Sequence, residues 1–580
     1  MKSLPQKFAF LFLLVFSSTL VFSQENNVLP KGLTETEQGI LSQFQFRSNR
    51  MSDPPSGPVR AAAEWEEVEY LVVRWTNSFQ NILRQIVEVG VEECKVIITT
   101  QNEASVSTYL TNAGVDLTNV IFLNTGSNSI WIRDYGGNTI YSDDVGERAY
   151  ADWIYNRPRP LDNIMPTAHA NLVGMPIYET NTGTYDLVNT GGNYMSDGLG
   201  NAFASKLILN ENSAGNPYGV SVKTEEQIDE IMNIYMGIEN YIKMETLPYD
   251  AIHHIDMHMK LLDEETLLVS KYPEGVADGP QIEENIEYVL SNFLSPFGTP
   301  YEVEWIDAPP SSGGNYPDTG GSYRTFSNSI FINKSVIVPV YRPEVDGPAL
   351  EKYQELLPGY TIVGVDVDNP DENLISLFGA IHCITHTIGV EDPLWIVHQP
   401  IDEANISATV SVDAMIKHNS GISAATVYWR EEGTSDFTQT SMSFDSGDDW
   451  SADLTVATDN IEYYIEAEAN SGKTLARPIV APEGFWTIQV GNLSTEDWAN
   501  NNISAPFPNP SQDKVSFNLN NVGGPIQVVI YNILGQKLFE TTIDNGNGII
   551  SLDLNQDWKG SLFVSFIGDF GIVTKKVIKI

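Results

Sequence analysis

The chain has 580 residues, of which 42% are hydrophobic and 19% charged, so it is long enough to form two or more globular domains. Its 76 acidic and 32 basic side chains give a net charge of -44, which would repel nucleic-acid phosphates and anionic lipid surfaces. We therefore expect no nucleic-acid partner. The same field favours a cationic substrate, although solubility or a salty habitat explains the charge without any partner.

The first residues predict a secretory signal peptide. Two lysines precede the apolar run Phe8 to Phe22, which is too short to span a bilayer and ends in a small-residue cleavage pattern. This pattern assigns residues 1–23 to the signal, with cleavage near Gln24. No later stretch is long and apolar enough for a membrane helix, so we expect an exported protein without a transmembrane segment.

Residues 24–57 are polar and end in MSDPPSGP, a Pro/Gly-rich stretch that is typical of a linker or pro-segment. Residues 58–396 then alternate between helical and strand patterns. Apolar side chains from Phe79 to Val87 follow a helical period and lead into a strand at Val96.

Two further helices carry start signals. Thr224 and Gln227 form a capping box at the first of them, and Pro348 stands at a first helical position before LEKYQELL.

Paired short strands are predicted between these helices, in residues 201–210, 258–272 and 329–341. Each segment consists of two apolar runs with a polar turn inside. Strand pairs that alternate with helices predict a repeated ββαβ-like unit, which closes more easily as a ring than as one open sheet. The predicted fold class of residues 58–396 is therefore α/β.

The remainder of the chain is predicted to be all-β. Past Trp395, four segments alternate at period two, with turn residues between them, which fits a small antiparallel sandwich over residues 397–490. A polar linker follows at residues 491–503. Residues 504–580 then form a second small all-β unit.

Cys94 and Cys383 are the two cysteines of the chain. An exported protein with two cysteines has either one disulfide or a thiol retained for chemistry. Cys94 begins an apolar, β-branched strand pattern and is typical of a core residue. Cys383 lies between two histidines in GAIHCITHTIG, residues 379–389, and the count alone leaves both alternatives open.

Four other segments combine polar side chains with glycines or aromatic residues. They are SIWIRDYGG (129–137), GGNYMSDG (191–198), HHIDMH (253–258) and GGSYRTFSNSIFIN (320–333). Burying a carboxylate is costly unless it is paired, so Asp134 needs a partner. The neighbouring Arg133 could supply one without any function.

The cluster HHIDMH contains four possible metal ligands. If it forms a strand, His254, Asp256 and His258 share one face and His253 points to the other. Three ligands on one strand close a tetrahedral site poorly. An acid/base pair or a packed histidine is therefore favoured over zinc, and we predict no required metal or cofactor.

The order of these motifs resembles the guanidine-modifying superfamily. WIRD, GGN followed by DG, His-x-Asp, NKSVIVPVY and GAIHCIT occur in succession. They are most similar to the branch of bacterial agmatine deiminases and secreted, Porphyromonas-type peptidylarginine deiminases, whose usual start resembles PVRAAAEWEEVE (58–69). The resemblance covers residues 58–396 and implies a five-bladed, pseudo-symmetric α/β propeller.

The resemblance also implies a reaction and its residues. A guanidinium is a planar cation and a poor electrophile, so two carboxylates must hold it while a thiolate attacks its central carbon. Asp134 and Asp256 match the clamping pair, and Cys383 matches a free nucleophile that forms a covalent thiouronium intermediate. His254 matches the general acid and base, and Asn328 the site asparagine of the family. The products would be citrulline and ammonia.

Arg157 and Arg159, in YNRPRP, point to the other end of the substrate. Two arginines can grip a carboxylate but would repel the distal amine of agmatine. A similar segment of the secreted peptidylarginine deiminases binds a C-terminal carboxylate, so with Trp131 as a third binding residue we expect peptides or proteins with a C-terminal arginine. One alternative is that the protein is a deiminase of agmatine or free arginine. Another is that the two arginines only form ion pairs with acidic side chains at the surface.

The C-terminal regions carry a second resemblance. APFPNPS (505–511), YNILGQ (531–536) and KKVIKI (575–580) resemble the C-terminal sorting domain of type IX secretion. Residues 397–490 resemble the Ig-like domain of secreted peptidylarginine deiminases. Together these imply a secreted or outer-surface protein that has the type IX machinery as a partner.

Three points stay open at the level of sequence. The β regions could instead belong to an inactive surface-binding protein. Structural calcium is a hypothesis for the acidic loop DVDNPDEN (366–373). His382 and His386 are assigned only to packing.

Overall fold

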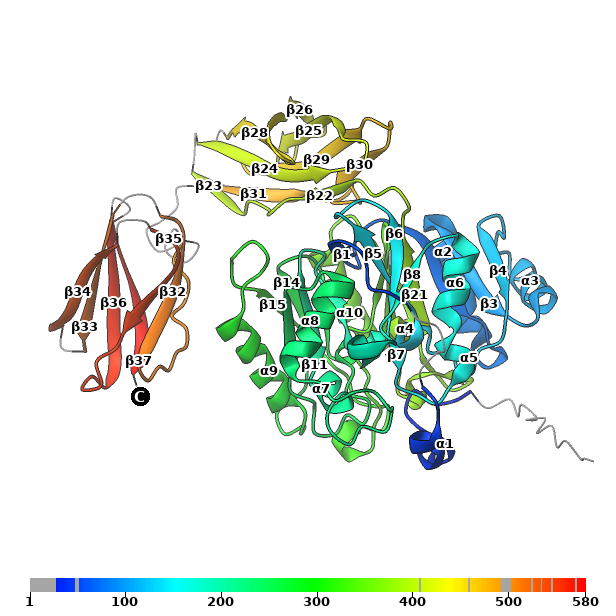
Figure 1. Ribbon diagram of the computed structural model, residues 1–580. Helices are drawn as coiled ribbons and strands as arrows, with labels where there is room; N and C mark the ends of the chain where they lie inside the picture. The colour runs from blue at the N-terminus through cyan, green and yellow to red at the C-terminus, as the bar shows by residue number, and fades with distance from the viewer. Residues whose placement is uncertain are drawn as a thin grey trace, which may run out of the picture.

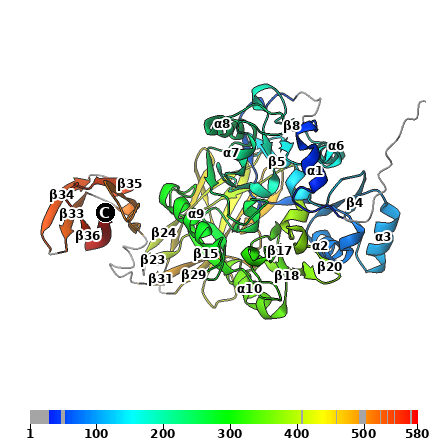
Figure 2. The same ribbon diagram turned by 90° about the horizontal axis from the view of Figure 1, so that it is seen from below.

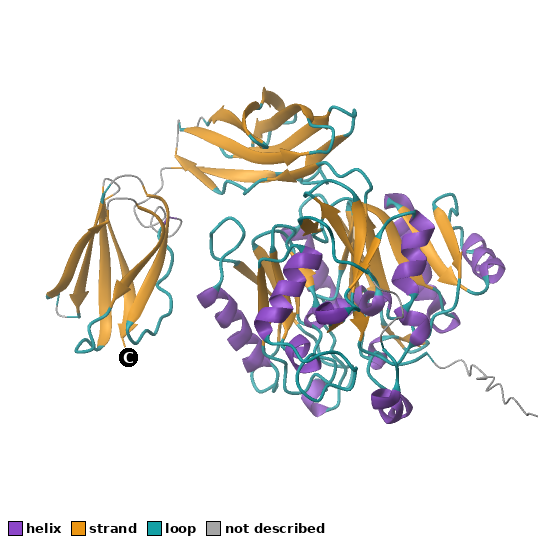
Figure 3. Cartoon of the chain, in the orientation of Figure 1, coloured by secondary structure: helices purple, strands orange, loops and turns teal. Residues whose placement is uncertain are grey.

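A computed structural model describes residues 28–46, 52–405, 408–456, 459–491 and 502–579, the last range with short gaps at 523–524, 534, 544–545 and 569–570. The predicted signal peptide, 1–23, and most of the predicted linker 491–503 lie outside the described residues. An α/β unit is followed by two regions built of strands (Figures 1 and 3). Helix α1 (Glu35–Ile40) and the first of these regions lie at opposite ends of the α/β unit (Figure 1).

Within the described residues, the α/β unit contains five sheets of three or four strands. Each sheet joins an antiparallel strand pair to a parallel neighbour through a helix. In spatial order the strands are β1 (Val59–Ala61), β5 (Asn138–Ser142), β6 (Arg148–Asp152) and β8 (Ile177–Glu179); β10 (Met195–Ser196), β11 (Asn201–Ser205) and β12 (Asn240–Met244); β13 (Met259–Leu261), β14 (Thr266–Lys271) and β15 (Glu302–Asp307); β16 (Ile330–Ile332), β17 (Ser335–Val340) and β18 (Thr361–Asp366); and β21 (Thr385–Gly389), β2 (Val68–Arg74), β3 (Lys95–Thr100) and β4 (Val120–Asn124).

The helices that connect the parallel strands run along the outer edge of the unit. Figure 2 shows them around the strands, which lie inside. They are α2 (Gln80–Glu93), α6 (Met165–Val173), α8 (Glu225–Met236), α9 (Gly279–Asn292) and α10 (Pro343–Leu356). Helix α3 (Glu103–Asn112) connects the parallel strands β3 and β4. Shorter elements are α4 (Ile132–Tyr135), α5 (Pro160–Asn163), α7 (Leu207–Glu211) and the two-residue ladders β7–β9 (Ile154–Tyr155, Val188–Asn189) and β19–β20 (Asp368–Asn369, Glu372–Asn373).

The beginning and end of the α/β unit meet in one sheet. Strand β21 pairs antiparallel with β2, so residues 385–389 lie beside residues 68–73. One apolar core extends from Ala63 to Ile388 and includes the inward side chains of α2 and of β2, β3, β14 and β17. Packing of this core therefore joins segments that are more than three hundred residues apart in the chain.

Local sequence signals predicted several of these elements correctly. The helix from Phe79 is α2, and the capping box of Thr224 and Gln227 is present at the start of α8. The strand pairs in 258–272 and 329–341 are the hairpins β13–β14 and β16–β17. These segments hold polar turns between runs of residues that favour strands.

Two local predictions were wrong. Residues 201–210 are not a strand pair, because only β11 is a strand and the following run is helix α7. Pro348 lies inside α10, which begins five residues earlier at Pro343. Pro343 takes the first helical position, where a missing N–H costs nothing, so the later proline had no such role to fill.

The first all-β region packs two sheets around one core. Strand β22 pairs with β24, so this region begins at Trp395, slightly before the predicted boundary at 397. One sheet contains β22 (Trp395–Val397), β24 (Thr409–Lys417), β28 (Asp449–Thr455) and β27 (Ser443–Ser446); the other contains β23 (Glu403–Asn405), β31 (Trp486–Gly491), β29 (Ile461–Ala469), β25 (Ile422–Glu431), β26 (Thr438–Ser441) and β30 (Thr474–Arg477).

The second all-β region has its own apolar core. It contains the pair β32 (Lys514–Val522) and β35 (Gly546–Asp553), and a sheet of β34 (Lys537–Ile543), β33 (Ile526–Asn532), β36 (Gly560–Gly568) and β37 (Gly571–Lys579).

Ion pairs connect the first all-β region to the α/β unit. Arg477 Nη2 lies 2.9 Å from Glu264 Oε2, and Lys473 Nζ lies 2.6 Å from Glu67 Oε2. These contacts fix the region against one end of the unit, and the end that faces α1 stays clear of it (Figure 1).

Candidate active site

Two buried carboxylates from distant segments share one cation. Asp134 lies in α4 and Asp256 in the 3-10 turn Ile255–Met257, and each is only 1% exposed. The ammonium Nζ of Lys31 lies 3.8 Å from Asp134 Oδ1 and 3.5 Å from Asp256 Oδ1. Arg133, the partner considered for Asp134 from the sequence, pairs instead with Glu64 at 3.2 Å. The two carboxylates therefore form a pocket for a positive charge.

Cys383 faces the same cation. It lies in the 3-10 turn His382–Ile384 and is fully buried. Lys31 Nζ donates a hydrogen bond to its Sγ at 2.9 Å, and Asp256 Oδ2 lies 3.6 Å from that sulfur. Both cysteines are free, so the disulfide between Cys94 and Cys383 does not form. A thiol, two carboxylates and a cation thus meet at one point.

His254 completes the cluster from the Asp134 side. Its Nδ1 lies 3.4 Å from Asp134 Oδ1, and its buried Nε2 has no hydrogen-bond partner within the described part of the chain. The segment around it is a turn and not the strand assumed from the sequence, and His258 pairs with Asp250 at 3.2 Å. Among the described residues, no group of three His, Cys, Asp or Glu side chains could hold a metal ion, so the zinc arrangement considered for HHIDMH is not formed.

Two glycines make room for this cluster. A Cβ atom on Gly192 would overlap the ring of His254 and come within 3.0 Å of Asp134 Oδ1. A Cβ atom on Gly191 would overlap the carbonyl oxygen of Arg133. The motif GGN is therefore required by the close approach of three segments, which only residues without a side chain permit.

Asn328 and His382 hold the cluster in position. Asn328 Nδ2 donates to the carbonyl oxygen of Asp256 at 2.9 Å, and its Oδ1 accepts from the backbone N–H of His382 at 3.0 Å. The His382 ring lies between Asp256 Oδ2 at 2.9 Å and Glu64 Oε1 at 2.7 Å. Sequence reasoning missed these positions of His382 and Glu64, since nothing in either motif distinguishes a hydrogen-bonded side chain from a packed or solvated one.

The charges of the cluster follow from burial and the shared cation. Burial, and then the Asp256 carboxylate, raise the pKa of the Cys383 thiol to about 12 against the opposing effect of Lys31. Burial works to raise the pKa of Asp256 too, but Lys31 and then His382 hold that pKa far below its ordinary value. Burial and Lys31 lower the pKa of His254. At neutral pH we expect a protonated thiol, two carboxylates and a neutral imidazole.

The predicted substrate-binding residues contact the N-terminal segment of the same chain. Trp131 Nε1 donates to the carbonyl oxygen of Leu29 at 2.9 Å. Arg157 Nε donates to the carbonyl oxygen of Lys31 at 3.2 Å. Both side chains are buried, so the alternative of solvated pairing with surface acids does not describe Arg157.

Arg159 binds the same segment further along. Its Nη2 donates to the carbonyl oxygens of Pro30 at 2.8 Å and Gly32 at 3.0 Å. Its Nε donates to Glu37 Oε1 at 2.7 Å, and the arginine is only 1% exposed. The three predicted binding residues therefore surround one stretch of backbone that leads into the cluster.

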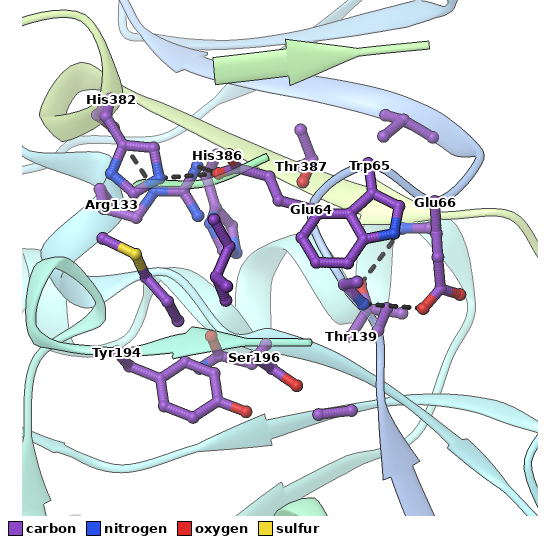
Figure 4. A pocket seen from close by; sticks show the side chains of 18 of the residues that line it. Glu64, Trp65, Glu66, Arg133, Thr139, Tyr194, Ser196, His382, His386 and Thr387 are labelled. Carbon is purple, nitrogen blue, oxygen red and sulfur yellow. Dashed lines mark hydrogen bonds and ion pairs between the residues drawn. The ribbon is translucent and has the colours of Figure 1, made fainter. Parts of the chain in front are cut away.

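A separate pocket borders the cluster at His382 (Figure 4). Its lining includes Glu64, Arg133, Lys260 and His386. Glu64 pairs with Lys260 and Arg133 there, and His386 contacts the carbonyl oxygen of Gly137. Through these contacts Glu64 holds the ring of His382 on the side away from Asp256.

Two carboxylates of the acidic loop 366–373 have protein partners. Asp368 forms a bidentate pair with Arg324, at 2.8 and 2.9 Å. Glu372 accepts from the backbone N–H groups at the start of α2, at 2.9 Å each. Both contacts are structural, so we do not extend the calcium hypothesis to these two side chains.

Comparison with known proteins places the α/β unit in a family. Residues 58–388 match the Porphyromonas-type peptidyl-arginine deiminase family. The chain belongs to this family. Its members are deiminases of guanidino groups, which are hydrolases of C–N bonds, and the α/β unit with the Cys383 cluster is the matched part.

Individual relatives of the chain share only about a quarter of its residues over the matched part. The chain is 25% identical over 298 residues to a putative agmatine deiminase of Shewanella baltica, covering 46% of this chain and 76% of that protein. It is 24% identical over 294 residues to one of Yersinia pseudotuberculosis, covering 47% and 77%. An X-ray structure of a putative agmatine deiminase superposes with a TM-score of 0.51 at 20% identity, over 59% of this chain and all of that one, which shows a shared fold.

A second match concerns the C-terminal region. Residues 505–580 match the secretion system C-terminal sorting domain. This domain indicates type IX secretion, to the cell surface or outside the cell. In the described residues we find no helix whose length and hydropathy would allow it to cross a membrane.

Proposed function

We propose that this protein is a protein-arginine deiminase that converts peptidyl-arginine, in particular C-terminal arginine, to citrulline and ammonia. The observation that carries the proposal is the position of Lys31 Nζ, a cation 2.9 Å from Cys383 Sγ and paired with Asp134 and Asp256. A guanidinium bound at this point would lie between two carboxylates with a thiol beside its central carbon.

The proposed reaction has two stages. The proton of Cys383 passes to His254, the Sγ–Cζ bond forms, and the Cζ–N bond to a terminal nitrogen breaks while His254 returns a proton to the departing ammonia. A water molecule then loses a proton to His254 and attacks Cζ. The Sγ–Cζ bond breaks to give the ureido group of citrulline, the remaining hydroxyl proton returns to the sulfur to restore the resting thiol, and His254 releases its proton to solvent. The unpartnered Nε2 of His254 supports this double role.

The substrate itself favours ionisation of the thiol. Burial and Asp256 raise the pKa of Cys383 to about 12, so the resting thiol is protonated. A positive charge beside the sulfur lowers its pKa, as Lys31 does here. A bound guanidinium would take over that effect, so the nucleophile would form mainly when substrate is present.

Backbone contacts at the entrance support a peptide substrate. Arg157 holds the carbonyl oxygen of Lys31, at the place where the α-carboxylate of a C-terminal arginine would lie. Trp131 holds the carbonyl oxygen of Leu29, two residues before it. Agmatine has neither group, so these donors would have no partner on it. The relatives that are named putative agmatine deiminases keep agmatine as the second candidate.

The proposal includes two points of architecture. The five similar sheets, the outer helices and the pairing of β21 with β2 support a closed five-bladed propeller. The two packed sheets after Trp395 support an Ig-like domain between the deiminase and the sorting domain.

A comparison of substrates tests the proposal. Ammonia and citrulline would be measured with a peptide ending in arginine, a peptide with internal arginine, and agmatine. We expect Arg157→Ala to raise KM for the peptide ending in arginine by about tenfold and to change agmatine turnover little. Only the peptide has a carboxylate that Arg157 can bind, so only the peptide loses a contact. Arg84→Ala, which removes a half-exposed pair with Glu88, is the matched control. Turnover of agmatine alone would reverse the choice of substrate.

A further inference from the structure

Residues 28–46 of the chain itself occupy the active site as a peptide would. The backbone N–H of Lys31 donates to the carbonyl oxygen of Leu377 at 3.0 Å, and the Lys31 carbonyl accepts from Arg157. Residues 28–34 form neither helix nor strand, and they enter the site between Trp131 and Arg159. Lys31 is thus held by its backbone on both sides while its side chain points to Cys383.

The Lys31 side chain ends where a reacting carbon would be. Counted from Cα, Nζ is the fifth side-chain atom of lysine, and the electrophilic Cζ is the fifth side-chain atom of arginine. Lys31 Nζ lies 2.9 Å from Cys383 Sγ, close to the roughly 3 Å separation from which a nucleophile attacks. An ammonium group carries the charge of a guanidinium but has no carbon for the thiolate to attack. Lysine therefore fits the site and cannot react.

Helix α1 anchors the segment independently of Lys31. Thr34 and Glu37 form a capping box that starts the helix. The same Glu37 carboxylate accepts from Arg159 Nε at 2.7 Å, so one of the predicted substrate-binding arginines is occupied. Burial works to raise the pKa of Glu37, but Arg159 lowers it overall, so this pair is ionised at neutral pH.

The anchored segment closes the site to solvent. Lys31, Cys383, His254 and Trp131 all have an exposure of 0%. A substrate can reach Cys383 only after Lys31 leaves, because both need the same position between Asp134 and Asp256. While Lys31 stays in place, its ammonium group neutralises the buried carboxylates of Asp134 and Asp256, so the closed state leaves none of these three charges unpaired.

We propose that residues 28–46 are an intramolecular substrate mimic, in which Lys31 fills the guanidinium site and keeps the deiminase of the full-length chain closed. The identity of that site rests on the function proposed above. Displacement of this segment frees Arg157 and the position between Asp134 and Asp256 for the arginine of a substrate peptide.

The first experiment turns the mimic into a substrate. In the full-length Lys31→Arg variant, the introduced arginine places Cζ beside Cys383 and should be converted to citrulline in its own chain, with a mass increase of about 1 Da and release of ammonia. The rate should not depend on protein concentration. Lys334→Arg, at an exposed turn between β16 and β17, should stay unconverted. Adding Cys383→Ser to Lys31→Arg should stop the conversion.

The second experiment measures access without turnover. In a Cys383→Ser background, binding of a peptide ending in arginine is measured by calorimetry with and without Lys31→Gln. Affinity should rise at least about tenfold when the competing cation is removed, because a closed site lowers the apparent affinity in proportion to its population. Lys334→Gln should leave affinity unchanged.

The two experiments separate the mimic from the reaction. Equal peptide affinity with and without Lys31, or an unconverted arginine at position 31 in a protein that deiminates added peptide, would overturn the mimic and leave the proposed function intact. Tighter binding in the Lys31→Gln protein together with no turnover when Cys383 is present would support the closed site and refute the deiminase reaction.

Discussion

The two cysteines of this chain share a raised pKa but have different surroundings. Burial raises the pKa of both thiols to about 12. Cys94 follows the end of α2 and packs against the apolar core, with Glu93 as its charged neighbour. Cys383 lies against Lys31 and Asp256, whose charges act on it in opposite directions. Burial alone gives an inert thiol, whereas a site with an exchangeable cation lets a ligand control ionisation.

Replacement of each sulfur should give the largest contrast. We expect Cys383→Ser to lower kcat for peptidyl-arginine by more than about a thousandfold, since a serine hydroxyl is a far weaker nucleophile at this site. Cys94→Ser should leave kcat within about twofold, because this thiol contacts no reacting group. Ammonia release under identical conditions measures both. Substantial activity without the Cys383 sulfur would refute its role.

The neighbouring carboxylates should differ in the same way. Asp256→Asn removes half of the negative charge around the guanidinium and the partner of His382, so kcat/KM should fall by about a hundredfold. Glu93→Gln, beside Cys94, should change kcat/KM by less than about twofold. It should lower thermal stability slightly, because Glu93 accepts from Ser335 Oγ at 2.6 Å. Similar kinetic losses in both variants would indicate a structural role for Asp256.

The pH dependence of alkylation should be the same for both thiols in the resting protein. Only the thiolate reacts, and with pKa values of about 12 its fraction should rise about tenfold per pH unit between about pH 7 and pH 10. The peptides that carry each cysteine can be followed separately by mass spectrometry. A plateau for Cys383 near its unperturbed pKa of about 8.5 would mean that Lys31 outweighs burial.

Truncation of Cys94 should have the smallest effect. Cys94→Ala removes a partly buried sulfur from the edge of the core and should lower the free energy of unfolding by about 1 kcal/mol without a change in kcat. Denaturant unfolding and the ammonia assay measure the two quantities. Lost activity at unchanged stability would mean that Cys94 is coupled to the site.

Much of the fold could be predicted because its signals are local. Helix α2 and the hairpin β13–β14 follow from apolar spacing and turn residues within each segment. The run after β11 was misjudged because its few apolar residues fit a strand or one helical turn equally well. Pro348 was misjudged because two prolines compete for one helix start, and only packing shows which one occupies it.

The site was predictable to the extent that its residues occur in motifs. Asp134, His254, Asp256 and Cys383 were named in advance, and the structure brings them together. His382 and Lys31 were not named as site residues. A histidine beside the cysteine and a lysine in a polar N-terminal stretch have no pattern that separates them from packed or solvated side chains.

Most helices and strands and the C-terminal sorting signal follow from the sequence alone, and the motifs also predicted which residues would bind and attack a guanidinium. These depend on periodicity and on side-chain chemistry, which are properties of short segments. Long-range packing brings Lys31 to Cys383, 352 residues further along the chain, and places Arg157 and Arg159 against the N-terminal segment. Such contacts depend on which distant surfaces pack together, and that choice is made by the whole core.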